Sequence, residues 1–573
     1  MSNKIQNVSL EEKKTNDKKL LNLKNDIDTK KKQLKKYKAL VGPLSLLWKK
    51  KIEKLEIQYN QEKLNSLKLF SPAVEDIEEK DIRKMKGFNN FYLGVNENYQ
   101  PLYINNINQH LSVFGGSGSG KSVFLFGLLN QVIRKGGGAC MIDGKGDLDM
   151  LQEFIGHARE LGREKDVLVL SFDKGSKSNT FNIFKSLPLE EIKTIISNVA
   201  IGKTDDFFKQ QTAAFLETIF GILSYLEKKG DPLSLKILIQ ALNLKVLIVN
   251  LIPASKTNPN EPDQELLELN ELTEFKKFWV NKEYYKNGDI VSKVVEDFVG
   301  GYGGKIWKTE DEKEEDSMQG VKQIPEELQK QIGGYSAMYI KTIDTLSKNF
   351  NSILNAPKND IDFKDIISQN KLIYVKVPSM KLSEDEKSSI GAFVIASIKN
   401  AIAEALGDEI EIEKETAFTT LNKEQRTSNP KFLLVLDEMA EFFSKSKNDI
   451  GIIFSQARSV EIGIVVSTQD VASLSTGTDG MNFVDKMLGN SFTKVFLKTT
   501  DTSTLEKMKA IIRDRYYGKI DEEGKEIEEQ TKEIEEFVKG SKNGLGVAVN
   551  DNFTKFCAPY IPAKKVTDFK FNR

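Results

Sequence analysis

The sequence is poor in the residues that build metal sites and disulfides. Its 573 residues include only two cysteines and two histidines. Cys140 and Cys557 are far apart in the chain and match no metal-ligand spacing, so a structural zinc site is not expected. Cys140 lies in an apolar stretch, where a small buried hydrophobic residue is the simplest interpretation.

Long apolar runs are also missing. The N-terminus is polar and lacks the apolar core of a signal peptide. The apolar run at residues 39–48 is about half the ~20 residues that span a bilayer. We therefore expect a cytoplasmic protein, in a compartment where thiols stay reduced.

Neither sign of charge is in excess. The chain contains 83 Lys and Arg and 83 Asp and Glu residues, so its formal net charge is zero. A nucleic-acid partner would have to be bound by a local basic surface rather than by the whole molecule. Charged residues make up 29% and hydrophobic residues 39% of the chain, as in globular proteins, and the length predicts two or three domains.

The most informative motif follows Leu111. Residues 111–114 are apolar and predict a short strand, residues 123–133 predict an amphipathic helix, and the segment between them has the spacing G-x-x-x-x-G-K-[ST]. In such a loop, backbone N–H groups surround phosphates at a helix N-terminus. A chance match in a glycine and serine turn is the alternative, but the order of strand, loop and helix argues against it.

We expect every residue of this loop to contribute to phosphate binding. Lys121 would reach the β- and γ-phosphates, and the hydroxyl of Ser122 would bind Mg²⁺. The predicted phosphate loop consists of Gly115, Gly116, Ser117, Gly118, Ser119, Gly120, Lys121 and Ser122.

A second apolar strand, predicted at residues 139–142, ends in the charged sequence Asp143-Gly-Lys-Gly-Asp147. Charged residues just beyond the carboxyl end of a parallel strand face the ligand crevice of an α/β sheet. As a bare pattern, this pentapeptide could equally be a polar turn. A further strand is predicted at residues 167–172, and the alternation of strands and helices predicts an α/β fold with a mainly parallel sheet.

Two acids follow the apolar segment Phe432–Leu436. In a nucleoside triphosphatase, the first acid, Asp437, would hold Mg²⁺, and the second, Glu438, would orient and activate the attacking water. An apolar strand that ends in two acids is common by itself. It becomes informative downstream of a phosphate loop.

Two more polar residues accompany the next predicted strand, residues 462–467. Gln469 follows that strand and is placed to sense the γ-phosphate or the water. Arg458 ends the predicted helix 448–457, where an arginine is usually a surface charge or a partner of the helix C-terminus. If subunits form a ring, the same arginine can enter the neighbouring site as an arginine finger.

Between the two halves of the predicted sheet, residues 187–346 have a helical pattern. Phe215, Ile219, Ile222 and Leu226 recur on one helical face, and strand patterns are scarce. This segment predicts an inserted all-α domain. The predicted sheet domain then has two parts, residues 81–186 and 347–573. In the second part, Ser383 and Glu386 predict a capping box at the start of a long helix. Residues 514–539 are charge-dense and suggest a hairpin or coil, and residues 544–549 and 553–560 predict a closing strand pair.

Residues 1–80 form a separate Lys-rich segment. Leu20, Ile27, Leu34 and Val41 recur every seven residues, which is typical of a helix that packs on a partner helix. The Gly42-Pro43 pair predicts a turn between two helices of a hairpin. The alternative is that the Leu- and Trp-containing run beside it docks peripherally at the inner face of the cell membrane or on a membrane-bound partner.

Taken in order, these motifs resemble the TraD/TraG-type coupling proteins of conjugation and type IV secretion, relatives of the FtsK and HerA DNA pumps. The resemblance covers about residues 91–563 and includes the phosphate loop, the Asp143 pentapeptide, the helical insertion, the Asp437-Glu438 pair, Ala457-Arg458 and Ser467-Thr468-Gln469. It implies a RecA-like P-loop ATPase domain, an inserted all-α domain, a hexamer, and ATP-driven delivery of DNA or nucleoprotein to a secretion channel.

The resemblance also implies site residues and partners. Lys121 and Ser122 would bind ATP and Mg²⁺. Asp437 would hold the metal ion and Glu438 would activate the water. Gln469 would sense the phosphate, and Arg458 would act as an arginine finger in the neighbouring subunit. Expected partners are DNA, a relaxase or other protein substrates, and membrane-bound secretion-channel proteins.

Two departures from the family pattern leave alternatives open. Gly144 stands where the family usually has proline, and the transmembrane helices with which members usually begin are not seen. The chain could instead be an ATPase that receives protein substrates through the helical insertion, or a secretion-assembly ATPase, with little DNA motor activity.

Overall fold

The computed structural model describes most of the predicted sheet domain and part of the two helical segments. The described residues are 10–36, 51–56, 58–59, 90–96, 100–104, 106–200, 206–228, 230, 232–242, 326–407, 432–441, 447–475, 480–516, 525–550, 552–561 and 563–571.

Within the described residues, 11 strands form one sheet at the centre of the molecule, in the order β2-β1-β11-β10-β9-β3-β8-β7-β4-β6-β5. The seven strands from β9 to β5 are parallel, and the four strands at the other edge pair antiparallel. The strands are β1 (Phe91–Asn96), β2 (Pro101–Ile104), β3 (Leu111–Phe114), β4 (Gly138–Asp143), β5 (Val167–Ser171), β6 (Leu372–Lys376), β7 (Phe432–Asp437), β8 (Ile462–Thr468), β9 (Thr493–Leu497), β10 (Leu545–Val549) and β11 (Phe553–Cys557). The prediction of an α/β fold with a mainly parallel sheet is confirmed.

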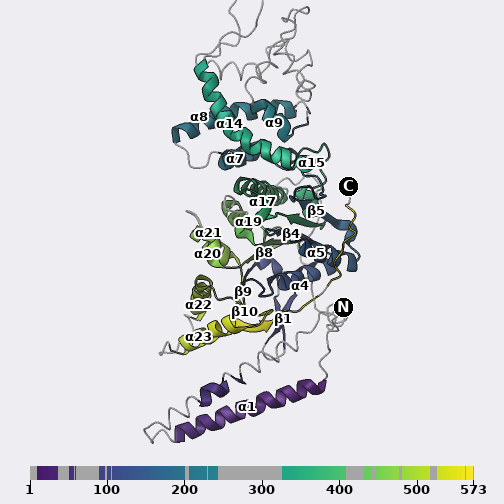
Figure 1. Ribbon diagram of the computed structural model, residues 1–573. Helices are drawn as coiled ribbons and strands as arrows, with labels where there is room; N and C mark the ends of the chain where they lie inside the picture. The colour runs from purple at the N-terminus through teal and green to yellow at the C-terminus, as the bar shows by residue number, and fades with distance from the viewer. Residues whose placement is uncertain are drawn as a thin grey trace, which may run out of the picture.

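Helices cover both faces of the sheet (Figure 1). One face packs on α4 (Lys121–Arg134) and α5 (Leu148–Glu160). The other face packs on α16 (Phe363–Ser368), α17 (Glu384–Gly407), α19 (Lys447–Gln456), α20 (Val471–Leu474), α21 (Gly480–Asn490), α22 (Thr502–Tyr516) and α23 (Lys525–Gly540).

The central strands are apolar throughout because both of their faces are buried. In β4, Ala139 and Met141 join the core on the α4 side, whereas Cys140 and Ile142 join the core on the α17 side. Cys140 is a buried free thiol, as expected, and burial raises its pKa far above the ordinary value.

One helix passes a simple membrane-span criterion within the described residues. The segment Glu384–Leu406 of α17 is long and apolar enough to cross a bilayer, but 72% of its apolar window is buried inside the structure. It packs against the sheet and the neighbouring helices, so core packing accounts for its composition.

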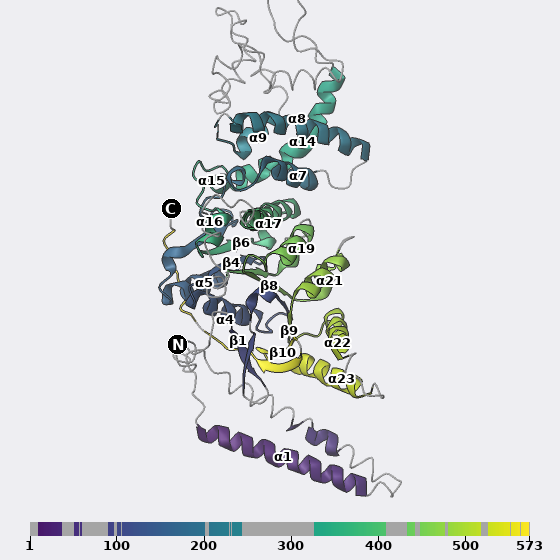
Figure 2. The same ribbon diagram turned by 180° about the vertical axis from the view of Figure 1, so that it is seen from behind.

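Beyond the β5 edge of the sheet, the described residues between 187 and 346 are helical (Figures 1 and 2). Phe215, Ile219 and Leu226, which were predicted to share one face, are all buried. Residues 243–325 lie outside the described residues. The described helices of this segment are α7 (Leu189–Ala200), α8 (Asp206–Lys228), α9 (Leu235–Leu242) and α14 (Glu326–Asn349), and the short helices α6 (Ile183–Ser186) and α15 (Asn351–Leu354) flank it.

The N-terminal segment contains two helical pieces that contact each other, α1 (Leu10–Lys36) and residues 51–56. The Nζ of Lys31 lies 2.7 Å from a carboxylate oxygen of Glu56, and Ile27 and Ile52 are both buried. This agrees with the predicted pairing of two helices. The predicted turn at Gly42-Pro43 lies outside the described residues.

One local prediction is wrong. The charge-dense residues 514–539 suggest a hairpin or coil, but residues 525–540 form the helix α23. Thr531, Ile534 and Val538 are buried at helical spacing, so a narrow stripe packs on the sheet domain. The charged side chains exposed between them are Lys532, Glu533, Glu536 and Lys539. The predicted final strand pair is confirmed as β10 and β11.

The start of α17 is fixed by a capping box, as the sequence predicts. The backbone N–H of Ser383 donates to Glu386 Oε2 at 2.8 Å, and the backbone N–H of Glu386 donates to Ser383 Oγ at 3.3 Å.

Ser383→Ala should lower the free energy of unfolding by about 1 kcal/mol, measured by denaturant titration. Ser383→Thr is the control, because it keeps the hydroxyl; equal losses in the two variants would contradict the role of the cap.

Candidate nucleotide site

The carboxyl ends of four neighbouring parallel strands lie level with one another. Phe114 of β3 pairs with Thr468 of β8, Ser467 pairs with Asp437 of β7, and Asp437 pairs with Asp143 of β4. Strand β8 separates the phosphate-loop strand from the Asp437 strand. This register brings the phosphate loop, Gln469, the two acids and the Asp143 turn to one edge of the sheet.

The phosphate loop has a tight backbone that depends on glycine. Gly118 and Gly120 have φ angles of 71° and 99°, and a Cβ on Gly115 would lie 2.5 Å from Ser119 Oγ. Ser117 and Gly118 are exposed at the tip of the loop. Helix α4 begins without a side-chain cap, so its first N–H groups remain available for an anion.

Neighbouring strands hold the loop in place. The backbone N–H of Gly116 donates to Lys498 O at 2.8 Å, and that of Gly544 donates to Ser119 O at 2.9 Å. A Cβ on Gly120 would lie 2.8 Å from the Gly544 nitrogen, so glycine is needed for this close approach. The segment before β10 is therefore part of the wall of the site.

Lys121 is buried inside the loop that it belongs to. Its Nζ donates to the carbonyl oxygen of Gly115 at 2.6 Å and lies 3.4 Å from Oε1 of Glu438. Burial lowers its pKa, partly offset by the charges of Glu438 and Asp437. A second anion at this position, such as a phosphate, would add favourable charge to a partly desolvated ammonium group.

Asp437 is a buried carboxylate that lacks a full set of partners. It is 2% exposed, and its Oδ1 has no hydrogen-bond partner. Burial raises its pKa to about 6, and the nearby charges of Glu438 and Asp143 act in the same direction. The unpaired carboxylate oxygen and the hydroxyl of Ser122, which makes only a 3.9 Å contact with Met150 Sδ, are the oxygen donors that Mg²⁺ prefers.

The Glu438 carboxylate contacts the side chains of two other predicted site residues. Its φ angle is +50°, a strained value for a non-glycine residue, and its backbone N–H donates to Ser467 O at 3.0 Å. Gln469 Nε2 donates to Glu438 Oε1 at 3.2 Å, and Lys121 approaches the same oxygen. The structure thus brings together Lys121, Glu438 and Gln469, which were predicted separately from three motifs.

One further residue at this point was given no role from the sequence. Lys145 Nζ lies 2.8 Å from Glu438 Oε1. Its pKa is raised, because burial, which lowers it, is outweighed by the hydrogen bond and charge of Glu438. The signal in the sequence was the placement of the pentapeptide at the end of a parallel strand. That pattern could not show which charge turns toward the acids.

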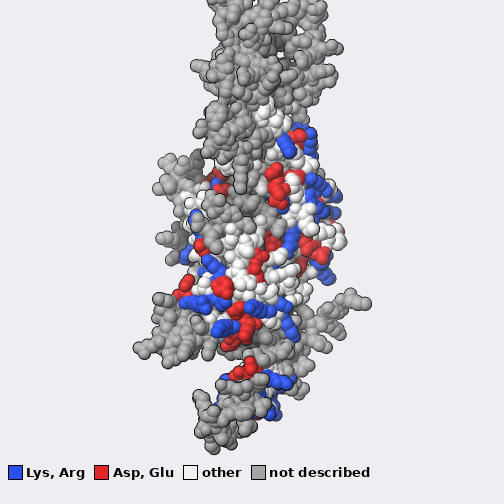
Figure 3. Space-filling view, turned by 60° about the vertical axis from the view of Figure 1, so that its left-hand side comes forward, with Lys and Arg blue, Asp and Glu red and all other residues white. Residues whose placement is uncertain are grey.

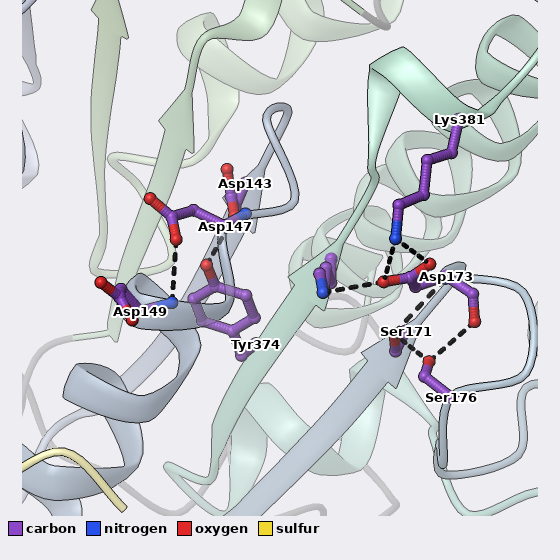
Figure 4. Close-up of polar contacts among 9 residues, drawn as sticks. Asp143, Asp147, Asp149, Ser171, Asp173, Ser176, Tyr374 and Lys381 are labelled. Atoms are coloured by element: carbon purple, nitrogen blue, oxygen red, sulfur yellow. Dashed lines mark hydrogen bonds and ion pairs between the residues drawn. The ribbon is translucent and has the colours of Figure 1, made fainter.

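The pentapeptide folds around the Asp143 carboxylate (Figure 4). Asp143 Oδ1 accepts the backbone N–H of Lys145 at 2.9 Å, and Oδ2 accepts that of Asp147 at 2.7 Å and the Tyr374 hydroxyl at 2.7 Å. Gly146 has a φ of +67°, and a Cβ there would lie 2.6 Å from Pro378. The turn is therefore rigidly built, and it directs Lys145 toward Glu438.

A second ion cluster in Figure 4 lies at the ends of β6 and β5, the next two strands of the sheet after β4. The Asp173 carboxylate pairs with Lys376 at 3.0 Å and Lys381 at 2.8 Å. Burial acts to raise the pKa of Asp173, but the two lysines outweigh it and lower that pKa. This cluster ties two loops together and makes no contact with Glu438 among the described residues.

Arg458 lies away from the other predicted site residues. It is exposed in the turn that precedes β8, and its charge helps to lower the pKa of His110, which burial lowers first, to about 4. Both Arg458 and His110 come just before strands, so they lie at the amino edge of the sheet, opposite the phosphate loop. Arg458 therefore cannot serve the site of its own chain.

Comparisons of the amino-acid sequence relate this chain to known protein families. The family model described as helicase HerA, central domain, matches residues 94–398. The Type 4 coupling protein DotL of Legionella pneumophila subsp. pneumophila is 23% identical over 431 residues, 72% of this chain and 50% of DotL. The predicted resemblance to coupling proteins is confirmed, although the match spans only half of DotL's length.

Solved structures give weaker matches. The unbound conjugative coupling protein TrwBΔN70 has a TM-score of 0.46 at 13% identity, covering 82% of this chain and 90% of that chain. TrwB in complex with ADP and Mg²⁺ has a TM-score of 0.41 at 14% identity, covering 81% and 87%.

Removing the unpaired buried charge should stabilise the empty site. We expect Asp437→Asn to raise the free energy of unfolding by on the order of 1–3 kcal/mol in nucleotide-free buffer with a chelator, because an amide costs less to bury than an unpartnered carboxylate. Denaturant titration measures the change. Tyr92→Phe, which removes a buried hydroxyl without a hydrogen-bond partner in β1, is the control; a destabilised Asp437→Asn protein would contradict this account.

Proposed function

This chain belongs to the family of the helicase HerA central domain, and on that premise we propose that it is an ATP-driven coupling protein. It would recruit DNA or nucleoprotein and pump it toward a type IV secretion or conjugation channel. The single observation that carries the proposal is the approach of Lys121 and Gln469 to one oxygen of Glu438, beside Asp437, whose Oδ1 has no hydrogen-bond partner.

ATP and Mg²⁺ fit the residues at this edge of the sheet. The phosphate loop would surround the phosphates with backbone N–H groups, and Lys121 would exchange its carbonyl partners for phosphate oxygens. Ser122 and Asp437 would hold Mg²⁺, which supplies charge neutralisation at the phosphates when bound. Their oxygens are available for this purpose, since one is unpaired and the other makes only a weak contact.

Glu438 is the proposed base. It would accept a proton from the attacking water, and Gln469 would hold the carboxylate and the water in line with the terminal phosphate. The strained backbone of Glu438 and its bond to Ser467 O fix the position from which the carboxylate acts.

Arg458 supports an assembly in which neighbouring subunits complete each other's sites. Because it lies at the sheet edge opposite the phosphate loop, an arginine finger on this chain must act in trans. We propose a homo-oligomer, with the hexamer implied by the family resemblance.

The surface that binds the transported DNA would cover only part of the molecule. On the face in Figure 3, Lys and Arg alternate with Asp and Glu over the described surface, in keeping with the zero net charge of the chain. DNA would therefore be bound by a restricted basic surface formed in the assembly. Relaxases or other protein substrates would be received by the helical insertion, residues 187–346.

The N-terminal hairpin within residues 1–80 would dock on a membrane-bound secretion-channel protein. This would place the motor, formed by residues 81–186 and 347–573, in the cytoplasm and peripherally at the inner face of the cell membrane. The contacts between α1 and residues 51–56 support an element that folds as a pair of helices.

ATP hydrolysis by the purified chain, with and without single- and double-stranded DNA, tests the function. We expect hydrolysis that DNA stimulates and that salt suppresses as phosphate contacts are lost. Glu438→Gln should bind ATP but lower turnover by about 10²-fold or more. Wild-type turnover in that variant would contradict the assignment of Glu438, and DNA-independent hydrolysis would favour a receptor for protein substrates or an assembly ATPase.

Mixing wild-type and Arg458→Ala subunits tests the contact in trans. An arginine finger contributes about 10³ to 10⁵ in rate, so activity should fall faster than the fraction of wild-type subunits. Steady-state hydrolysis at a series of mixing ratios measures this. Arg513→Ala, at an exposed arginine of α22, is the control; a strictly proportional decline with Arg458→Ala would exclude a finger.

A further inference from the structure

Two ammonium groups and one amide approach the Glu438 carboxylate, which is more hydrogen-bond donors than its proposed role as a base requires. Lys121 at 3.4 Å, Lys145 at 2.8 Å and the amide of Gln469 at 3.2 Å all approach the single oxygen Oε1. Glu438 is 6% exposed, whereas Lys145 is 45% exposed. The lone pairs of Oε1 are engaged by these donors, so this oxygen cannot readily orient a water molecule in the arrangement seen here.

The Lys145 side chain is freer to leave this pair than the Glu438 side chain, since the two are 45% and 6% exposed. The backbone of the Asp143 turn is fixed by Asp143 and by the contact of Gly146 with Pro378, but the Lys145 side chain is half exposed on a long flexible stem. The Glu438 backbone is fixed by its strained φ angle and by its hydrogen bond to Ser467 O. We therefore expect a rearrangement of the ion pair to move chiefly the lysine.

The place to which Lys145 can move follows from Lys121. Both ammonium groups lie within 3.4 Å of the same oxygen, so Lys145 borders the space where Lys121 would meet the β- and γ-phosphates. A terminal phosphate there brings more negative charge than one carboxylate and accepts several hydrogen bonds. When a diphosphate is bound instead, the position of the terminal phosphate is empty and this added negative charge is missing.

We propose that Lys145 senses the γ-phosphate by exchanging its Glu438 partner for the terminal phosphate. Without a triphosphate, Lys145 holds Glu438 in the paired arrangement seen here. With a triphosphate, Lys145 turns to the phosphate and Glu438 is released toward water. The inference rests on the proposed function, and it gives the Asp143 pentapeptide the task of positioning Lys145.

Equilibrium binding of ADP and of a non-hydrolysable ATP analogue, each with Mg²⁺, tests this exchange without relying on turnover. For Lys145→Gln we expect a roughly tenfold weaker affinity for the analogue, the scale of one lost charge-assisted hydrogen bond, with little change for ADP. Lys145→Arg should restore most of the preference for the analogue, because it restores the charge. Unchanged ADP binding also reports that the variant is folded.

The chain offers a closely matched control. Lys174 pairs with Glu386 at 3.2 Å, and the two side chains are 44% and 5% exposed, nearly the same as for Lys145 and Glu438. Lys174→Gln removes an equivalent ion pair away from the phosphate loop. It should leave the ratio of the two affinities unchanged.

A double-mutant cycle separates sensing from a structural role. Glu438→Gln alone should strengthen analogue binding, because no ion pair must be broken, and this gain should disappear when Lys145→Gln is also present. Additive effects of the two substitutions, or an unchanged affinity ratio in Lys145→Gln, would overturn the inference while leaving the proposed ATPase intact. Failure of the wild-type protein to bind either nucleotide would contradict both the inference about Lys145 and the proposed ATPase function.

Discussion

The register of the parallel strands is the constraint on which the site depends. The strands β3, β8, β7 and β4 end at the same level. Polar side chains stand at or directly after the ends of β8, β7 and β4, and the glycine-rich phosphate loop follows β3. The strands themselves are buried on both faces and cannot carry charged side chains along their length. The polar groups are therefore confined to the strand ends, where they are forced together and partly removed from water.

This confinement gives the edge of the sheet its electrostatic character. Asp437 and Asp143 are buried acids whose pKa values are raised by burial, while Lys121 is a buried base whose pKa is lowered by it. Each group is costly to keep charged in the folded protein, and each interacts with the next. The site stores free energy that a bound anion and cation would recover, as expected where function is favoured over stability.

Much of this arrangement could be predicted from the sequence, because strand ends and glycine-rich turns leave local patterns. The phosphate loop, the Asp437-Glu438 pair and Gln469 were found in this way. The contact of Lys145 with Glu438 was not, since side-chain direction after a strand depends on how the Asp143 turn closes. Helix α23 was missed because only a narrow stripe, including Ile534 and Val538, packs inward, and the surrounding charges obscure its period.

If Arg458 acts in trans as proposed, its position restricts how copies of this chain can associate. It lies at the amino edge of the sheet and the phosphate loop lies at the carboxyl edge, so the two functional edges of one subunit face in opposite directions. A contact that brings the Arg458 edge to the phosphate-loop edge of the next copy is heterologous and head to tail. Such a contact uses different surfaces on its two sides, so it repeats until the subunits close into a ring or grow into a filament.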